Sequence, residues 1–135
     1  MIEFENLYKS NKDYIQDLEN AAKRVINSGW YILGNEVKQF ETEFAEYLGV
    51  KYCIGVASGL DALILSIEAL SLPNNSDILV ASNTYIATIL AIIKAGHNPV
   101  LVEPDEKTFN IDPKKLEKSI TSKTKAICVT HLFGK

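Results

Sequence analysis

The chain has 135 residues, of which 47% are hydrophobic and 23% are charged, and its net charge is −3. This is the length of about one domain, and the composition excludes intrinsic disorder and a fibrous repeat. No apolar run approaches the roughly 18 residues of a membrane span, and the net charge gives no reason to propose binding of nucleic acid. Glu3 and Glu5 stand where a secretory signal carries positive charge. A cytoplasmic protein is therefore expected.

The first third of the chain predicts two amphipathic helices. Apolar residues recur at helical spacing over residues 14–26, behind a capping pair formed by Ser10 and Asp13, and the pattern stops at Gly29. A second helix is predicted over residues 37–48, and a glycine ends it as well. Both helices are expected to bury one apolar stripe.

From residue 52 onward, short apolar runs alternate with helical patterns. The runs cover residues 52–57, 78–81, 99–102 and 126–130, and the helical patterns cover residues 59–70, 84–95 and 113–120. Asp112 is the expected N-cap of the last helix, with Pro113 at its first position. Runs that are apolar throughout fit strands covered on both faces, and helical crossovers imply parallel strands. The predicted class is α/β, with β-α-β units and a mostly parallel sheet.

The two cysteines offer no chemistry of their own in this pattern. Cys53 and Cys128 each lie within an apolar run. This position predicts buried, unpaired thiols rather than a disulfide or a metal pair.

The residues after each apolar run form the candidate site, because ligands of an open parallel sheet bind beyond the carboxyl ends of its strands. Ser58 and Gly59 open a helix, where free backbone N–H groups and the helix dipole favour an anion such as phosphate; a plain capped helix start is the alternative. Tyr85 could stack on a planar ligand or pack in the core. His131 stands alone, which predicts a structural histidine or an acid/base group and no metal site. The acidic loop at residues 103–106 is expected to be solvated, with no catalytic pair.

Five segments, taken in order, resemble one known family. They are residues 29–34 (Gly-Trp-Tyr-Ile-Leu-Gly), 58–63, 82–88, 109–113 and 129–134. Together they resemble the DegT/DnrJ/EryC1/StrS family of sugar aminotransferases, from about residue 10 to the end of the chain. The resemblance implies the fold-type I architecture of pyridoxal 5'-phosphate-dependent transferases, usually as a homodimer. The chain would be the N-terminal part of the large domain, with a helical segment at about 1–50, βα units at about 51–135, and the C-terminal domain absent.

The resemblance also assigns roles to individual residues. Those that match contacts of pyridoxal 5'-phosphate are Ser58, Gly59, Leu60, Asp61 and Tyr85, the first four around the cofactor phosphate and Tyr85 against the pyridine ring. Trp30 and Tyr31 match the segment that lines the substrate side. The family commonly has threonine where Leu60 stands, and the present variant looks like that of transaminases acting on 3-keto sugar nucleotides.

The activity implied by the resemblance is amino transfer from an amino acid, glutamate being expected, to a keto sugar nucleotide such as a dTDP-linked 3-keto-6-deoxyhexose, in deoxyaminosugar and polysaccharide biosynthesis. The family's Schiff-base lysine lies further along, so the catalytic lysine is expected beyond Lys135 and the chain alone is expected to be inactive. The strand at 52–57 is expected to lack partners, because in this family it pairs with later strands. Two alternatives stay open: a pyridoxamine phosphate-dependent dehydratase of the same family, and a noncatalytic α/β module that binds a phosphorylated ligand.

Overall fold

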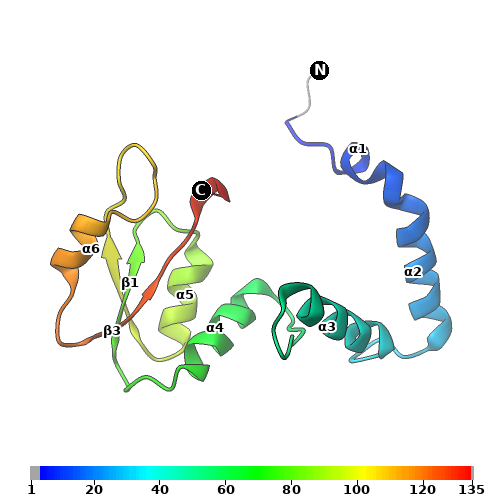
Figure 1. The fold of residues 1–135 in the computed structure, drawn as a ribbon, viewed down its shortest axis with the longest axis horizontal. Coiled ribbons are helices and arrows are strands. Elements are labelled where there is room, and N and C mark those ends of the chain that lie inside the picture. The colour runs from blue at the N-terminus through cyan, green and yellow to red at the C-terminus, as the bar shows by residue number, and fades with distance from the viewer. Residues whose placement is uncertain (1–3, 135) are drawn as a thin grey trace. The chain divides into compact units, whose positions relative to one another are not determined.

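The computed structural model describes residues 4–134, which form two compact units, residues 4–55 and 56–134 (Figure 1). The first unit contains α1 (Leu7–Asn11), a 3-10 turn (Lys12–Tyr14), α2 (Ile15–Ser28) and α3 (Asn35–Leu48). The second contains α4 (Gly59–Ala69), β1 (Asp77–Ala81), α5 (Ile86–Lys94), β2 (Asn98–Val102), α6 (Pro113–Ser119), β3 (Thr124–Cys128) and a 3-10 turn (Leu132–Gly134). None of the helices described is both long and apolar enough to cross a bilayer.

The two long helices of the first unit end where the sequence predicts. Gly29 follows α2 with φ 66°, and Gly49 follows α3 with φ 68°, a left-handed conformation that glycine adopts without steric cost. The start of α2 differs from the expectation, and the capping pair of Ser10 and Asp13 is wrong. Asn6 caps α1 by accepting the Lys9 N–H at 2.9 Å, and α2 begins after the 3-10 turn without a side-chain cap.

The second unit is built on a parallel sheet with the strand order β2-β1-β3, which confirms the α/β class. The central strand β1 is the most buried, and Leu79 and Val80 have no exposed surface. Val80 belongs to a core cluster that also includes Ile67 of α4 and Ile92 of α5. Each such side chain contributes roughly 1.5–3 kcal/mol of hydrophobic stabilisation. The core therefore joins the sheet to α4 and α5.

Residues 52–57 are not a strand, because the structure leaves this segment outside the sheet, but the expectation that the run lacks ladder partners holds among the residues described. Among the residues described it has no ladder partner, and Tyr52 and Ile54 are more than two-thirds exposed. The N–H of Gly55 donates instead to the Glu41 carboxylate at 2.7 Å. A strand is defined by its ladder, so an apolar run without a partner stays irregular.

The prediction for the cysteines holds in part. Cys53 and Cys128 are unpaired, but both are half-buried rather than fully buried. Cys53 lies in the segment that the sheet leaves out, whereas Cys128 packs partly against the core cluster, and this burial raises the pKa of its thiol.

Candidate cofactor-binding site

The beginning of α4 is organised by a serine cap. The Ser58 hydroxyl accepts the Asp61 N–H at 3.1 Å and donates to the Asp61 carboxylate at 2.9 Å. The Ser58 carbonyl accepts the Ala62 N–H at 3.0 Å. The N–H groups of Gly59 and Leu60, at the first two helical positions, lie outside these bonds. Two donors at the positive end of the helix dipole thus face outward, and the Asp61 N–H is used by the cap.

Gly59 has no conformational or packing requirement for glycine within the part of the chain described. A Cβ built on it meets no atom within 4 Å, and its φ is not positive. Leu60 packs its side chain against the core cluster while its N–H stays in the first turn. The absence of a side chain at Gly59 therefore leaves open space beside the two outward N–H groups, which suits the close approach of a ligand.

Tyr85 lies immediately before α5 and is 75% exposed. Within residues 4–134 its side chain makes no hydrogen bond and no ring contact. The core-packing alternative for this tyrosine is therefore not what the structure shows. Helices α4 and α5 lie alongside each other and both run opposite to β1, so both begin toward the carboxyl edge of the sheet (Figure 1).

A chain of threonine hydroxyls joins the loops after β1 and β3. The Thr84 hydroxyl lies 2.9 Å from the Thr130 hydroxyl and donates to Thr88 at 3.1 Å. Thr88 is buried in α5. His131, the next residue after Thr130, is exposed, and its acid/base role stays a prediction. The sequence places Thr84 at the start of a predicted helix and Thr130 at the end of a predicted strand, but only the folded chain shows that the two hydroxyls meet.

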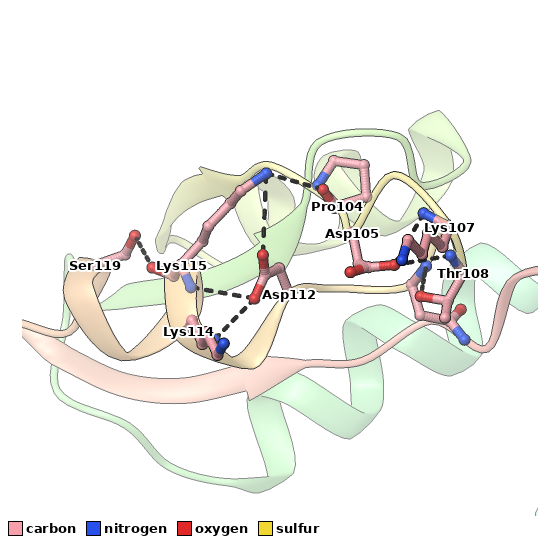
Figure 2. Close-up of polar contacts among 9 residues, drawn as sticks. Pro104, Asp105, Lys107, Thr108, Asp112, Lys114, Lys115 and Ser119 are labelled. Carbon is pink, nitrogen blue, oxygen red and sulfur yellow. Dashed lines mark hydrogen bonds and ion pairs between the residues drawn. The ribbon is translucent and has the colours of Figure 1, made fainter.

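The loop after β2 is solvated, as expected for residues 103–106, since Glu103 and Glu106 are exposed and Asp105 is half-buried, and hydrogen bonds also order it. The Asp105 carboxylate accepts the N–H groups of Lys107 at 2.9 Å and Thr108 at 2.8 Å (Figure 2). These two bonds, led by that from Thr108, lower the pKa of the Asp105 carboxyl. Asp105 therefore organises its own loop.

Trp30 and Tyr31 belong to the first unit and line a surface hollow there, with exposures of 52% and 65%. Arg24 and Glu36 border the same hollow and form a bidentate ion pair, with both N···O distances 3.1 Å. The hydrogen bond from Arg24 lowers the pKa of the Glu36 carboxyl. Lys38 lies over the Trp30 ring at 5.3 Å. The assignment of Trp30 and Tyr31 to the substrate side stays a prediction.

The sequence profile of the DegT/DnrJ/EryC1/StrS aminotransferase family matches residues 12–135. The chain belongs to this family. It is 57% identical to the dTDP-3-amino-3,6-dideoxy-alpha-D-galactopyranose transaminase of Aneurinibacillus thermoaerophilus, covering 99% of this chain and 37% of that protein.

Two solved structures of the DegT/DnrJ/EryC1/StrS family and its relatives agree with the fold. The crystal structure of S. venezuelae DesV with a ketimine intermediate superposes with a TM-score of 0.90 at 39% identity, over 98% of this chain and 36% of that one. The E. coli GDP-4-keto-6-deoxy-D-mannose-3-dehydratase with bound hydrated PLP gives a TM-score of 0.75 at 33% identity, over 82% and 30%. The chain thus spans little more than a third of the length of the curated relatives it matches. The predicted family and the predicted fold class are confirmed.

Proposed function

We propose that this protein is a pyridoxal 5'-phosphate-dependent sugar aminotransferase, and that its second unit supplies the contacts to the cofactor phosphate and ring. The observation that carries the proposal is the beginning of α4, where Gly59 leaves open space beside two outward N–H groups. Neither packing nor backbone conformation within residues 4–134 accounts for that glycine. The close approach of a ligand phosphate would account for it.

The residues present fit a phosphorylated pyridine cofactor. The N–H groups of Gly59 and Leu60 would donate to the phosphate, and hydrogen bonds to a charged group contribute roughly 1.5–3 kcal/mol each. Ser58 and Asp61 would hold the turn in shape through their two mutual bonds. Tyr85 would stack its exposed ring on the pyridine. When bound, the cofactor supplies the electron sink that amino transfer requires.

The substrate that we propose is a dTDP-linked 3-keto-6-deoxyhexose, with glutamate as the amino donor, in deoxyaminosugar and polysaccharide biosynthesis. The Aneurinibacillus relative, a dTDP-3-amino-3,6-dideoxy-alpha-D-galactopyranose transaminase, supports the position of the amino group and the nucleotide. The proposal places Trp30 and Tyr31 on the substrate side, the Schiff-base lysine beyond Lys135, and the enzyme in the cytoplasm as a homodimer.

A sugar dehydratase is the second candidate, because the E. coli dehydratase shares this fold at 33% identity. The two activities leave different products from a keto sugar nucleotide: amino transfer adds nitrogen at the carbonyl carbon, whereas dehydration removes a hydroxyl group. The full-length protein would be incubated with pyridoxal phosphate, glutamate and either a 3-keto or a 4-keto sugar nucleotide, followed by mass spectrometry. An amino sugar from the 3-keto substrate is expected, and a deoxygenated keto sugar would establish the dehydratase.

Binding of the cofactor is tested separately from turnover. The full-length protein would be titrated with pyridoxal 5'-phosphate and, separately, with pyridoxal, and binding would be followed by absorbance and fluorescence. The phosphate turn predicts a clear preference for the phosphorylated compound, since only that compound can accept the two N–H bonds. Equal affinity for both would contradict the assignment of Gly59 and Leu60. Tight binding by a full-length protein that forms no product would instead favour the noncatalytic module.

A further inference from the structure

The loop between β2 and α6 is closed on itself and fastened to the helix that follows. Pro104 and Ile111, at its two ends, pair in an antiparallel bridge. Lys115 of α6 donates to the Pro104 carbonyl at 3.1 Å and lies 4.0 Å from the Asp112 carboxylate (Figure 2). With the two bonds to Asp105 inside it, this loop is a small ordered body at the carboxyl edge. We call residues 104–111 the braced loop.

Two asparagine side chains connect the braced loop to the loops on either side. Asn83, just after β1, donates from Nδ2 to the Phe109 carbonyl at 2.9 Å. Asn110 accepts the N–H of Leu132, just after β3, through Oδ1 at 3.0 Å. The Asn110 carbonyl also accepts the Asp105 N–H at 2.9 Å within the braced loop. The segments that follow all three strands are therefore joined through two side chains.

Tyr85 depends on this connection more than an ordinary buried tyrosine would. It lies two residues after Asn83, and its exposed side chain has no hydrogen bond or ring contact in residues 4–134. Packing therefore does little to fix the position of the Tyr85 ring. That position depends instead on the backbone of the loop after β1. A ligand contact made by a mobile loop is weakened by the cost of ordering that loop on binding.

We propose that Asn83 and Asn110 are positioning residues that hold the carboxyl edge ready for the cofactor. Asn83 fixes the backbone that carries Tyr85, and Asn110 fixes the turn that begins at Leu132, both against the braced loop. Neither side chain is assigned a contact with the cofactor. This inference rests on the proposed function, because it supposes that Tyr85 contacts a cofactor ring.

The opposite polarities of the two bonds give a sharp test. Asn83 is a donor, so Asn83→Asp removes the bond and places a carboxylate against the Phe109 carbonyl. Asn110 is an acceptor toward Leu132, so Asn110→Asp keeps an oxygen in the same place. Both variants change the charge by the same amount, which makes each the control for the other. Asn83→Ala removes the donor without repulsion and serves if the first variant does not fold.

The full-length protein and each variant of it would be titrated with pyridoxal 5'-phosphate, and circular dichroism of the bound cofactor and amide hydrogen exchange would be measured as well. Asn83→Asp and Asn83→Ala are expected to weaken binding roughly fivefold, the effect of losing one hydrogen bond, and to change the cofactor's dichroism. Asn110→Asp is expected to keep the Leu132 amide protected and to weaken binding less than Asn83→Asp does. Asn110→Ala is expected to lose that protection.

The possible results separate the two proposals. If the wild-type chain binds pyridoxal phosphate and folded Asn83 variants bind it equally well, the positioning role is wrong. The same conclusion follows if Asn110→Asp weakens binding as much as Asn83→Asp, because a general charge effect then explains both. A full-length wild-type protein that binds no pyridoxal phosphate overturns the proposed function, and the role of both asparagines toward a cofactor with it.

Discussion

Replacement of Gly59 by alanine separates the requirements of the fold from those of a ligand. The added methyl group would meet no atom within 4 Å, and the backbone is not in the left-handed region. Alanine at the first position of α4 therefore fits the chain. It also restricts the unfolded state more than glycine does, which stabilises a protein by about 0.4–1 kcal/mol where the conformation is compatible.

The same methyl group would stand in the space that the proposed phosphate uses. It would push the phosphate away from the N–H groups of Gly59 and Leu60, and the loss of one bond to a charged group costs roughly 1.5–3 kcal/mol. Gly59→Ala is therefore expected to weaken binding of pyridoxal 5'-phosphate by about tenfold or more, because about 1.4 kcal/mol corresponds to a factor of ten. The melting temperature is expected to rise by about 1–4 °C.

Gly96→Ala is the matched control for this variant. A Cβ at Gly96 would also meet no atom within 4 Å, but the residue has φ 81° and lies just before β2, at the amino edge of the sheet. The left-handed conformation costs an alanine about 1–2 kcal/mol, so this variant is expected to melt at a lower temperature and to bind the cofactor normally.

Thermal unfolding and cofactor titration of both variants test whether glycine at position 59 serves the fold or the binding of the phosphate. Opposite changes in stability, with weaker binding in Gly59→Ala alone, are the expected pattern. Unchanged affinity in a folded Gly59→Ala protein would refute the placement of the phosphate at the beginning of α4. A fall in its melting temperature would show instead that the glycine serves the fold.

Three further variants or measurements test the local structure. Asp112 caps α6 by accepting the Lys114 N–H at 2.8 Å, so Asp112→Ala is expected to destabilise the chain by about 1 kcal/mol in urea unfolding. The pKa of the Asp105 carboxyl is lowered in the folded chain. The stabilisation that its ionised form gives to the fold is therefore present above the ordinary carboxyl pKa of about 3.9, and it is lost as the pH falls through the lower folded value. The protection factor of the Thr108 amide should therefore fall at acidic pH, and Asp105→Asn should remove that dependence. Burial raises the pKa of the Cys128 thiol, so its alkylation at pH 8 should be slower than that of a free cysteine, as measured by mass spectrometry.

Several features of the fold follow from short stretches of sequence. Glycine at positions 29 and 49 ends α2 and α3 because it alone adopts positive φ without cost. Asp112 and Pro113 mark the beginning of α6 because an aspartate cap and a proline suit those two positions. The apolar runs that become β1, β2 and β3 were located to within two residues at each end. Each of these signals acts between residues a few positions apart.

The sequence alone also determined the family, since the ordered motifs extend over most of the chain. The tertiary structure decided the features that depend on distant partners. The run at 52–57 does not become a strand, because apolar character supplies no ladder partner. The bonds from Asn83 to Phe109 and from Leu132 to Asn110 join residues 26 and 22 positions apart. Those residues come together only because three parallel strands end at the same edge of the sheet. No local sequence pattern predicts a contact between residues so far apart in the chain.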